Sequence, residues 1–413
     1  MKTISLAEGA NLLLIPEEKF KTTTLCLLVR RPLSRQEATW NACLPWVLKR
    51  GCAKYPTLSR VNEAAEAMYG AVFHAQVVKK GEEQLLQFLL EFVRMPGEDM
   101  LAQGAAFLRE IVYNPLVENE AFPEEVVKGA LVNVRNAIED RINDKAEYAK
   151  LKCLEIMCRD EPFGLYGDGY LEDLEQIDGA KLYAHYRNIL RTSLLEIAVT
   201  GNEPEENARR EAAALLPPER GEAQRPAKPE NRKKTAEEQR SGEKTGLTQG
   251  KLCIGLRTAA NPASQEIYKL LVANELLGGG ANSRLFVNVR EKESLCYYIN
   301  AIIYQFKAIM LIQSGVDAGN FDHVISLIRR EISVLQNDEY SDEELANAKK
   351  SAAKKFLGAK DYPAVLTDFY VSQRMLGTDT DLDGALEMIG QTTRGDVKTA
   401  AEGLCVDTIF TLA

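Results

Sequence analysis

Apolar residues recur with two different periods in the first hundred positions, and these periods predict alternating helices and strands. One group of apolar residues has the spacing of a helix face: Val61, Ala64, Ala65, Met68 and Tyr69. Ser59 is a candidate cap before this helix and Gly70 a stop after it. Alternation predicts a strand at Phe73, Ala75 and Val77. The next set has helical spacing and predicts a second amphipathic helix: Leu85, Leu86, Leu89, Phe92 and Val93.

The second half of the chain shows the same mixture of periods. Ser341 and Glu344 form a capping-box pair that opens a predicted helix running through Ala352. Two stretches of strand character, 295–304 and 309–316, are joined too closely for a parallel crossover, so antiparallel neighbours are expected. The predicted class is therefore α+β, with helices layered on mixed, largely antiparallel sheets.

The pattern of the first half returns in the second half at an offset of 227 to 229 residues. An apolar strand at Leu25–Arg30 is followed by a helical stretch and Gly51, and Leu252–Arg257 is followed by another such stretch and Gly278. A similar apolar segment also lies 20 residues before the last strand of each copy. The sequence thus predicts two duplicated αβ domains of matching design.

Residues 217–250 separate the two copies and are rich in Glu, Lys, Arg, Gln and Pro, with almost no aliphatic pattern. Such a segment buries too little apolar area to offset the entropy lost on ordering it. The predicted domains are therefore 1–216 and 251–413, joined by a solvated, charged linker at 217–250. An exposed charged helix over part of 235–243 is the alternative for the linker.

Composition and charge exclude several classes of function. The chain is 45% hydrophobic and 27% charged, and its net charge of -9 is spread without a basic stripe, so nucleic acid is not an expected partner. No apolar run has the length of a membrane span, and the N-terminus lacks a signal-peptide pattern. The eight cysteines form no Cys-x-x-Cys pair and mostly lie in apolar segments, as free thiols do. A cytoplasmic protein is expected.

The most informative chemistry lies between Gly278 and Tyr297. Three glycines precede a Ser-Arg-Leu-Phe run, and Arg290 and Tyr297 follow. A guanidinium and a phenol can both donate hydrogen bonds to an oxygen that gains negative charge. Taken alone, the glycines also fit a helix end, Arg290 a surface ion pair and Tyr297 an ordinary strand residue.

The sequence offers no metal-ligand spacing to accompany this pair. Its three histidines, His74, His185 and His323, lie too far apart for two of them to share one helix as ligands. No metal site is therefore predicted in this chain, and these histidines are interpreted as structural.

Gly278–Tyr298 resembles the C-terminal signature of the insulinase, pitrilysin and mitochondrial-processing-peptidase family. In that family a Gly-Gly-Gly-x-x-Ser-Arg-Leu-Phe run leads into Arg-Glu-Lys and a tyrosine. Met68–Ala71, Glu161–Phe163 and the duplicated design are also similar, so the resemblance covers essentially the whole chain. It implies that Arg290 and Tyr297 bind the scissile carbonyl of a peptide and reach toward a zinc site.

Active members of this family carry an inverted His-x-x-Glu-His on their first helix, which corresponds here to Thr39–Leu48. The alignment leaves a one-residue ambiguity, and over both registers the degenerate metal-site positions are Asn41, Ala42, Leu44, Pro45 and Trp46. None of them is a histidine or an acid, and Glu139 lies out of register for the downstream ligand glutamate. Without imidazole or carboxylate groups no divalent ion is held here and no base activates water.

The resemblance therefore implies a non-catalytic, substrate-binding subunit of a heteromeric zinc metallopeptidase acting on peptides. The chain is expected to be inactive alone, with no cofactor of its own, and to act with a homologous partner chain that bears the zinc motif. Two such chains would close around a chamber, and a peptide would add a strand to an exposed sheet edge. Without the partner the chain could form a homodimer.

Two alternatives remain open from the sequence. The first is a non-enzymatic scaffold or peptide-binding homologue, like the family's core subunits in respiratory complexes. The second is an autonomous zinc peptidase with unusual ligands, which stoichiometric zinc in the purified chain would favour.

Overall fold

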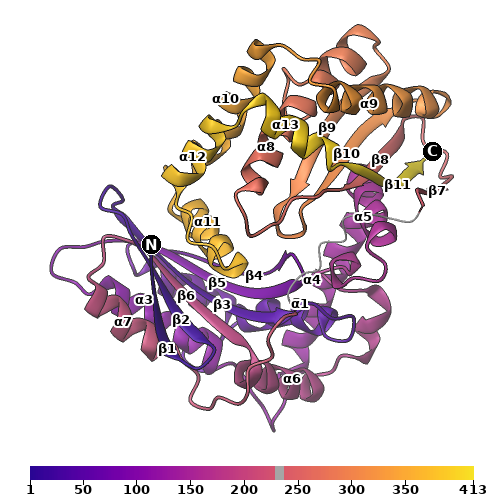
Figure 1. Cartoon of the computed structure of the whole chain (residues 1–413). Coiled ribbons are helices and arrows are strands. Elements are labelled where there is room, and N and C mark those ends of the chain that lie inside the picture. The colour runs from indigo at the N-terminus through magenta and orange to yellow at the C-terminus, as the bar shows by residue number, and fades with distance from the viewer. Residues whose placement is uncertain (228–236) are drawn as a thin grey trace. The chain divides into compact units, whose positions relative to one another are not determined.

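The computed structural model describes residues 1–227 and 237–413, which form two compact units, each built on one sheet (Figure 1). The first unit comprises residues 1–140, 165–227 and 359–375. The described part of the second comprises residues 141–164, 237–358 and 376–413. Within the described residues, no helix is both long and apolar enough to cross a membrane.

The first sheet has six strands in the order β1-β2-β6-β3-β5-β4. Their bounds are β1 Lys2–Ala7, β2 Ala10–Pro16, β3 Thr22–Pro32, β4 Val72–Lys80, β5 Glu83–Val93 and β6 Leu194–Gly201. The β2–β6 pair is parallel and the other pairs are antiparallel. Strands β3 and β6 lie in the middle and are buried almost throughout, because helices cover both faces of the sheet there.

The second sheet has five strands in the order β7-β11-β8-β10-β9. Their bounds are β7 Gln239–Glu243, β8 Gly250–Arg257, β9 Cys296–Tyr304, β10 Ile309–Val316 and β11 Cys405–Leu412. The β7–β11 pair is parallel and the others are antiparallel, as in the first sheet. Leu27 pairs with Ile197 in the first sheet, and Ile254 pairs with Ile409 at the same place in the second. The predicted duplication and the α+β class are therefore confirmed.

Helices cover the two sheets. The first unit holds α1 Ala38–Leu48, α2 Leu58–Glu66, α3 Met100–Tyr113, α6 Gly179–Thr192, α7 Glu205–Ala214, most of α4 Glu124–Asn143 and nearly all of α11 Pro363–Leu376. The second holds α5 Lys145–Met157, α8 Glu266–Leu277, α9 Phe321–Gln336, nearly all of α10 Asp342–Ala359, α12 Leu382–Gln391, α13 Arg394–Glu402 and a π-helical turn, η3, Phe286–Lys292. Short 3₁₀ turns are η1 Pro162–Gly164, η2 Leu171–Gln176, η4 Gln305–Lys307 and η5 Ala318–Asn320.

Each half of the sequence contributes one helix to the unit of the other half. Helix α5 comes from the first half and packs on β8, β10 and β11 of the second sheet. Helix α11 comes from the second half and contacts the first sheet, where the Thr367 and Thr200 hydroxyls are 2.6 Å apart. The domain bounds 1–216 and 251–413 stay a prediction from the sequence, and the compact units differ from them by the exchange of a helix.

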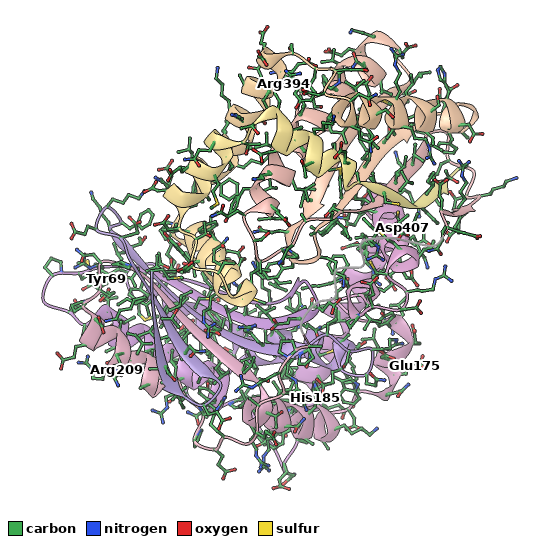
Figure 2. All side chains as sticks on the ribbon, viewed as in Figure 1. Tyr69, Glu175, His185, Arg209, Arg394 and Asp407 are labelled. Atoms are coloured by element: carbon green, nitrogen blue, oxygen red, sulfur yellow. The ribbon has the colours of Figure 1, made fainter. Side chains whose placement is uncertain are left out.

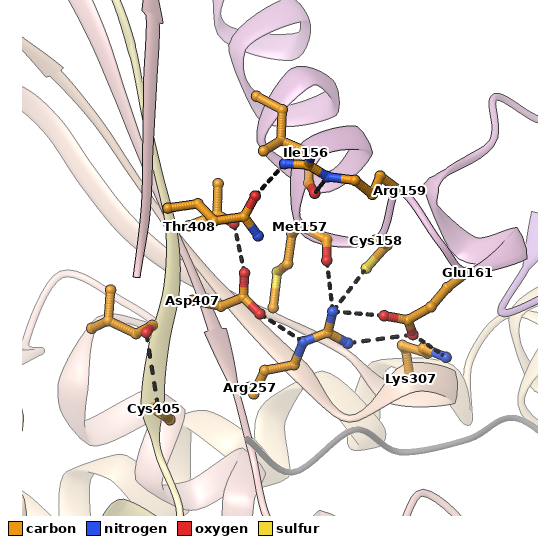
Figure 3. Close-up of polar contacts among 12 residues, drawn as sticks. Ile156, Met157, Cys158, Arg159, Glu161, Arg257, Lys307, Cys405, Asp407 and Thr408 are labelled. Carbon is orange, nitrogen blue, oxygen red and sulfur yellow. Dashed lines mark hydrogen bonds and ion pairs between the residues drawn. The ribbon is translucent and has the colours of Figure 1, made fainter. Parts of the chain in front are cut away.

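A buried ion cluster holds α5 and the residues after it on the second sheet (Figure 3). Arg257 donates to Glu161 Oε1 at 2.6 Å, to Asp407 Oδ2 at 3.0 Å and to the Met157 carbonyl at 2.7 Å. The Lys307 ammonium lies 2.6 Å from the same Glu161 carboxylate. Burial alone would raise the pKa of Glu161, but the two cations outweigh burial and lower it. The cluster therefore keeps its charges matched inside the core, where an unpaired charge would be strongly destabilising.

Residues 83–93 form strand β5 and not the predicted amphipathic helix, so that prediction is wrong. A two-residue turn at Gly81, with φ +59°, makes β4 and β5 a hairpin, and β3 pairs along the other side of β5. Burial alternates from Leu86 onward, but Leu89 and Val93 are apolar residues on the less buried face, so the apolar positions imitate helical spacing.

Two smaller expectations also need correction. The cap of α2 is Thr57, whose hydroxyl accepts from the Arg60 N–H at 3.3 Å, and not Ser59. Part of the predicted linker is ordered, because residues 239–243 form edge strand β7 and pair with β11. The alternative of a charged helix is wrong for these five residues, and residues 228–236 of the linker lie outside the described residues.

Other local predictions are confirmed. The Ser341 N–H donates to Glu344 and the Glu344 N–H donates to the Ser341 hydroxyl, as a capping box requires. Strands β9 and β10 are antiparallel neighbours.

Candidate functional site

Arg290 lies on η3, just before edge strand β9 of the second sheet. Its Nε donates to the backbone carbonyl of Tyr297 at 3.0 Å, and its guanidinium carbon stands 4.4 Å from the centre of the Phe286 ring. Within the described part of the chain its two terminal nitrogens have no recorded partner. The guanidinium is therefore held in place by one hydrogen bond and one ring face, with donors left over.

Tyr297 is the second residue of β9, and its side chain is 63% exposed. The structure brings Arg290 to the backbone of Tyr297, and no contact between the guanidinium and the phenol is recorded. Both polar groups thus lie at one end of β9 with donors available to a third molecule.

The segment before Arg290 is anchored by Arg284 of the Ser-Arg-Leu-Phe run. Arg284 donates to Glu331 of α9 at 2.8 Å and to Glu344 of α10 at 2.5 Å. Leu285 and Val289 are fully buried beneath the same segment. The motif therefore fixes η3 to two helices, which gives Arg290 a rigid base.

The middle of β9 is paired on its outer side within its own unit. The Ala301 N–H donates to the Gly278 carbonyl at 2.8 Å, and Asn274 donates to the Ala301 carbonyl at 3.2 Å. A side chain at position 278 would bring its Cβ within 2.8 Å of the Ala301 Cβ. The first glycine of the triplet is thus required for close approach of two backbones.

Strand β4 takes the corresponding edge position in the first sheet, and much of its outer side is open. In the described chain, backbone hydrogen bonds of residues 72–78 run only to β5. Val72, His74 and Gln76 are exposed, whereas Lys79 at the far end donates to the Leu165 carbonyl at 2.8 Å. An edge of this kind offers unpaired N–H and C=O groups to an added strand.

The degenerate metal-site positions lie on α1 of the first unit. Ala42, Leu44 and Pro45 are buried, and Trp46 is half-buried with the Lys49 ammonium 3.4 Å from its ring centre. None of these side chains can ligate zinc. Among residues 1–227 and 237–413 no cluster of three or more histidine, cysteine, aspartate or glutamate side chains is placed to hold a metal ion.

Asn41 joins a hydrogen-bond chain that the sequence did not reveal. Gln84 Nε2 donates to two backbone carbonyls, of Ala38 at 2.9 Å and Gly167 at 2.6 Å, which leaves Gln84 Oε1 as an acceptor. Asn41 Nδ2 donates to that oxygen at 2.7 Å, and Asn41 Oδ1 faces His185 Nε2 at 2.9 Å. His185 therefore donates through Nε2.

His185 comes from α6, on the lower side of the first unit as drawn (Figure 2). Burial lowers its pKa to about 4, so the imidazole is neutral at physiological pH. In sequence it lies 144 residues from Asn41, and no local pattern connects the two. The first helix is thus stabilised by neutral amide and imidazole groups at a position where a zinc-binding helix would carry a ligand.

Cys296, next to Tyr297, is no candidate nucleophile. Its side chain is buried, and burial raises the pKa of the thiol, so it stays protonated at neutral pH.

Fold and site together define a duplicated metallopeptidase-type chain that keeps the Arg/Tyr segment and has no zinc ligands on its first helix. Residues 176–352 match the family described as Peptidase M16 inactive domain. The "Probable inactive metalloprotease YmfF" of Bacillus subtilis is 28% identical over 98% of this chain and 96% of its own length.

Solved structures agree with that relationship. A conserved protein from Enterococcus faecalis V583 superposes with a TM-score of 0.91 at 26% identity, covering 100% of this chain and 98% of that one. A peptidase M16 inactive domain from Pseudomonas fluorescens has the same fold, with a TM-score of 0.79 at 17% identity over 100% and 97% of the chains. The resemblance to the insulinase and pitrilysin peptidase family, M16, is thus confirmed, in a chain whose first helix carries no zinc-binding motif.

Proposed function

We propose that this chain is the non-catalytic, substrate-binding subunit of a heteromeric zinc metallopeptidase. In this proposal a homologous partner chain supplies zinc and the general base, and this chain supplies Arg290 and Tyr297. The substrate is a peptide whose scissile carbonyl accepts hydrogen bonds from the two side chains.

The observation that carries the proposal is the state of Arg290. Its Nε and its ring-facing side are used within the unit, and its terminal nitrogens are left as donors. Such a preorganised guanidinium stabilises an oxygen that gains charge as water attacks, because it needs no rearrangement during the reaction. The exposed phenol of Tyr297 offers a second donor at the same end of β9.

The open edge of β4 supports the peptide-binding part of the proposal. A peptide that adds a strand there is bound through its main chain, so extension matters more than sequence. On β9 the Ala301 N–H and carbonyl are already paired, so this edge offers fewer free groups to an added strand than β4 does.

The experiment reconstitutes the chain with a homologue that carries an intact His-x-x-Glu-His and measures peptide cleavage. R290A is expected to lower kcat by about 10²- to 10³-fold, as loss of one donor to a developing oxyanion does. Assembly, measured by native mass spectrometry, should be unchanged.

The matched control is K292A on the same helical turn, because Lys292 is exposed and, within the described residues, bonds to Asn288 at 3.0 Å without another recorded partner. K292A should leave turnover unchanged. Equal turnover of R290A and the native chain would overturn the proposed role.

A second candidate function is a non-enzymatic scaffold. The bond from Arg290 Nε to the Tyr297 carbonyl favours it, because this bond would also retain the arginine for structure alone. In that case R290A lowers the melting temperature, and the reconstituted mixture cleaves no faster than the zinc-bearing chain alone.

A further inference from the structure

We propose that the exposed apolar face at the start of α11, formed by Tyr362 and Val365 and called here the α11 patch, reads the side chains of a peptide bound on β4. The inference rests on the proposed function in one respect, the pairing of an extended peptide with the β4 edge. It adds the substrate class: peptides with an apolar residue at one position along that strand.

Helix α11 is fixed beside that end of β4. The Lys80 ammonium lies 2.7 Å from Asp368 Oδ1 and 2.8 Å from the Ser372 hydroxyl. Val78 and Val371 line one small cavity between the strand and the helix. Val365 lies one helical turn before Asp368, so it is on the flank of α11 that faces this end of the strand.

The patch is exposed although the rest of its helix is well packed. Tyr362 is 64% exposed and Val365 50%, whereas Leu366 is 1% and Val371 3% exposed. Single exposed apolar residues are ordinary, but Tyr362 immediately precedes α11 and Val365 lies three positions later in its first turn. Such a surface is suited to apolar side chains of a bound chain.

The faces of β4 show which peptide side chains would reach the patch. Phe73 packs on Phe107 of α3 at 5.3 Å between ring centres, so odd-numbered side chains point away from α11. Gln76 bonds to Gln87 at 2.7 Å, and Gln87 lines the cavity beneath α11, so even-numbered side chains share the α11 face. A peptide strand about 4.8 Å beyond β4 would present every second side chain to that face.

Charge narrows the substrate class further. The Asp368 side chain is 53% exposed at the border of the patch, and Asp361 is exposed in the preceding turn. The Lys80 ammonium lies 2.7 Å from Asp368 and balances that carboxylate, so repulsion by Asp368 does not decide the preference. The apolar surface itself selects an apolar side chain, and an acidic one is disfavoured there because its charge loses hydration.

The test measures binding of fluorescein-labelled nine-residue peptides to the purified full chain by fluorescence anisotropy. A Ser/Thr peptide is compared with versions that carry one Leu or one Glu, scanned along the peptide. The best Leu position is expected to bind about tenfold more tightly than Ser, because it buries part of a Leu side chain, and Glu should bind more weakly than Ser.

The double variant Y362S/V365S should reduce that Leu-to-Ser ratio to about one while the Ser/Thr peptide binds as before. The matched control is L357S, which changes another exposed apolar residue, 49% exposed, on α10 of the second unit. L357S should leave the ratio at about ten, and circular dichroism checks that each variant is folded.

A peptide with alternate N-methylated amides tests strand pairing on β4 separately from side-chain recognition by the α11 patch. Loss of its binding shows strand pairing, and an unchanged Leu-to-Ser ratio in Y362S/V365S then overturns the α11 patch alone. Binding that N-methylation leaves intact overturns strand pairing on β4, and absence of binding by every peptide overturns both.

Discussion

Strands β4 and β9 hold the same place in two copies of one fold, yet their outer edges differ. The glycine after the first helix of each copy accounts for the difference. Gly278 accepts from the Ala301 N–H and seals β9, whereas Gly51 packs on the backbone of Tyr55 and Pro56 and does not reach β4. A duplicated fold can therefore divide two tasks between its copies by changing one loop, without changing the sheet.

The first prediction compares equivalent edge residues. Ala75 pairs with Phe88 and Ala301 with Ile312, and these partners lie opposite the equivalent residues Leu27 and Ile254. A301P should lower the free energy of unfolding by about 3 kcal/mol, since it removes a donor and leaves the Gly278 carbonyl unpaired. A75P should cost less than about 1 kcal/mol, because proline is tolerated where an edge N–H faces outward. Urea denaturation measures both.

Equal losses for the two proline variants would show that the edges are alike. As a further check, hydrogen exchange at Ala75 should be faster than at Ala301, because only the second amide is paired.

The second prediction concerns the pH dependence of stability, to which the buried His185 of the first copy contributes. The pKa of His185 is lowered from 6.5 to about 4, so the unfolded chain takes up this proton at a higher pH than the folded one. Its stabilising contribution is therefore complete above pH 6.5 and is lost as the pH falls toward 4, by at most about 3 kcal/mol.

H185Q provides the reference, because glutamine keeps a donor for Asn41 and does not titrate. As the pH falls from 6.5 to 4, the native chain should lose more unfolding free energy than H185Q does. Parallel pH curves would contradict the burial of a neutral His185.

The third and smallest effect tests the close approach that seals β9. G278A should lower the free energy of unfolding by about 1–2 kcal/mol, because its Cβ would stand 2.8 Å from the Ala301 Cβ and force the loop from the strand. G390A is the control: it lies in helix α12 with nothing within 4 Å of the added Cβ, and should gain about 0.5–1 kcal/mol. Thermal denaturation measures both variants. Loss of stability in both, or in neither, would contradict the proposed close contact between Gly278 and Ala301.

Local patterns predicted well where one periodicity and one cap determine an element. The alternation at Phe73 to Val77 and the Ser341 capping box needed only neighbours in sequence, and both are present. The helix prediction for residues 83–93 was wrong because the less buried face of this strand carries the apolar residues Leu89 and Val93, which hide its alternation. The bond between Asn41 and His185 could not be predicted, since it joins residues from distant helices.

The sequence by itself determined the duplication, the α+β class, the Arg290 and Tyr297 segment and the lack of zinc-ligating side chains on the first helix, because each is written in residue types and spacing. Only the tertiary structure decided that α5 and α11 are exchanged between units and that Ala301 of β9 is paired with the Gly278 loop. It also decided that, among the described residues, the outer side of β4 and the terminal nitrogens of Arg290 have no recorded partner. The physical reason is that backbone hydrogen bonding between distant segments depends on where loops bring carbonyl and amide groups, and side-chain patterns carry almost no record of that.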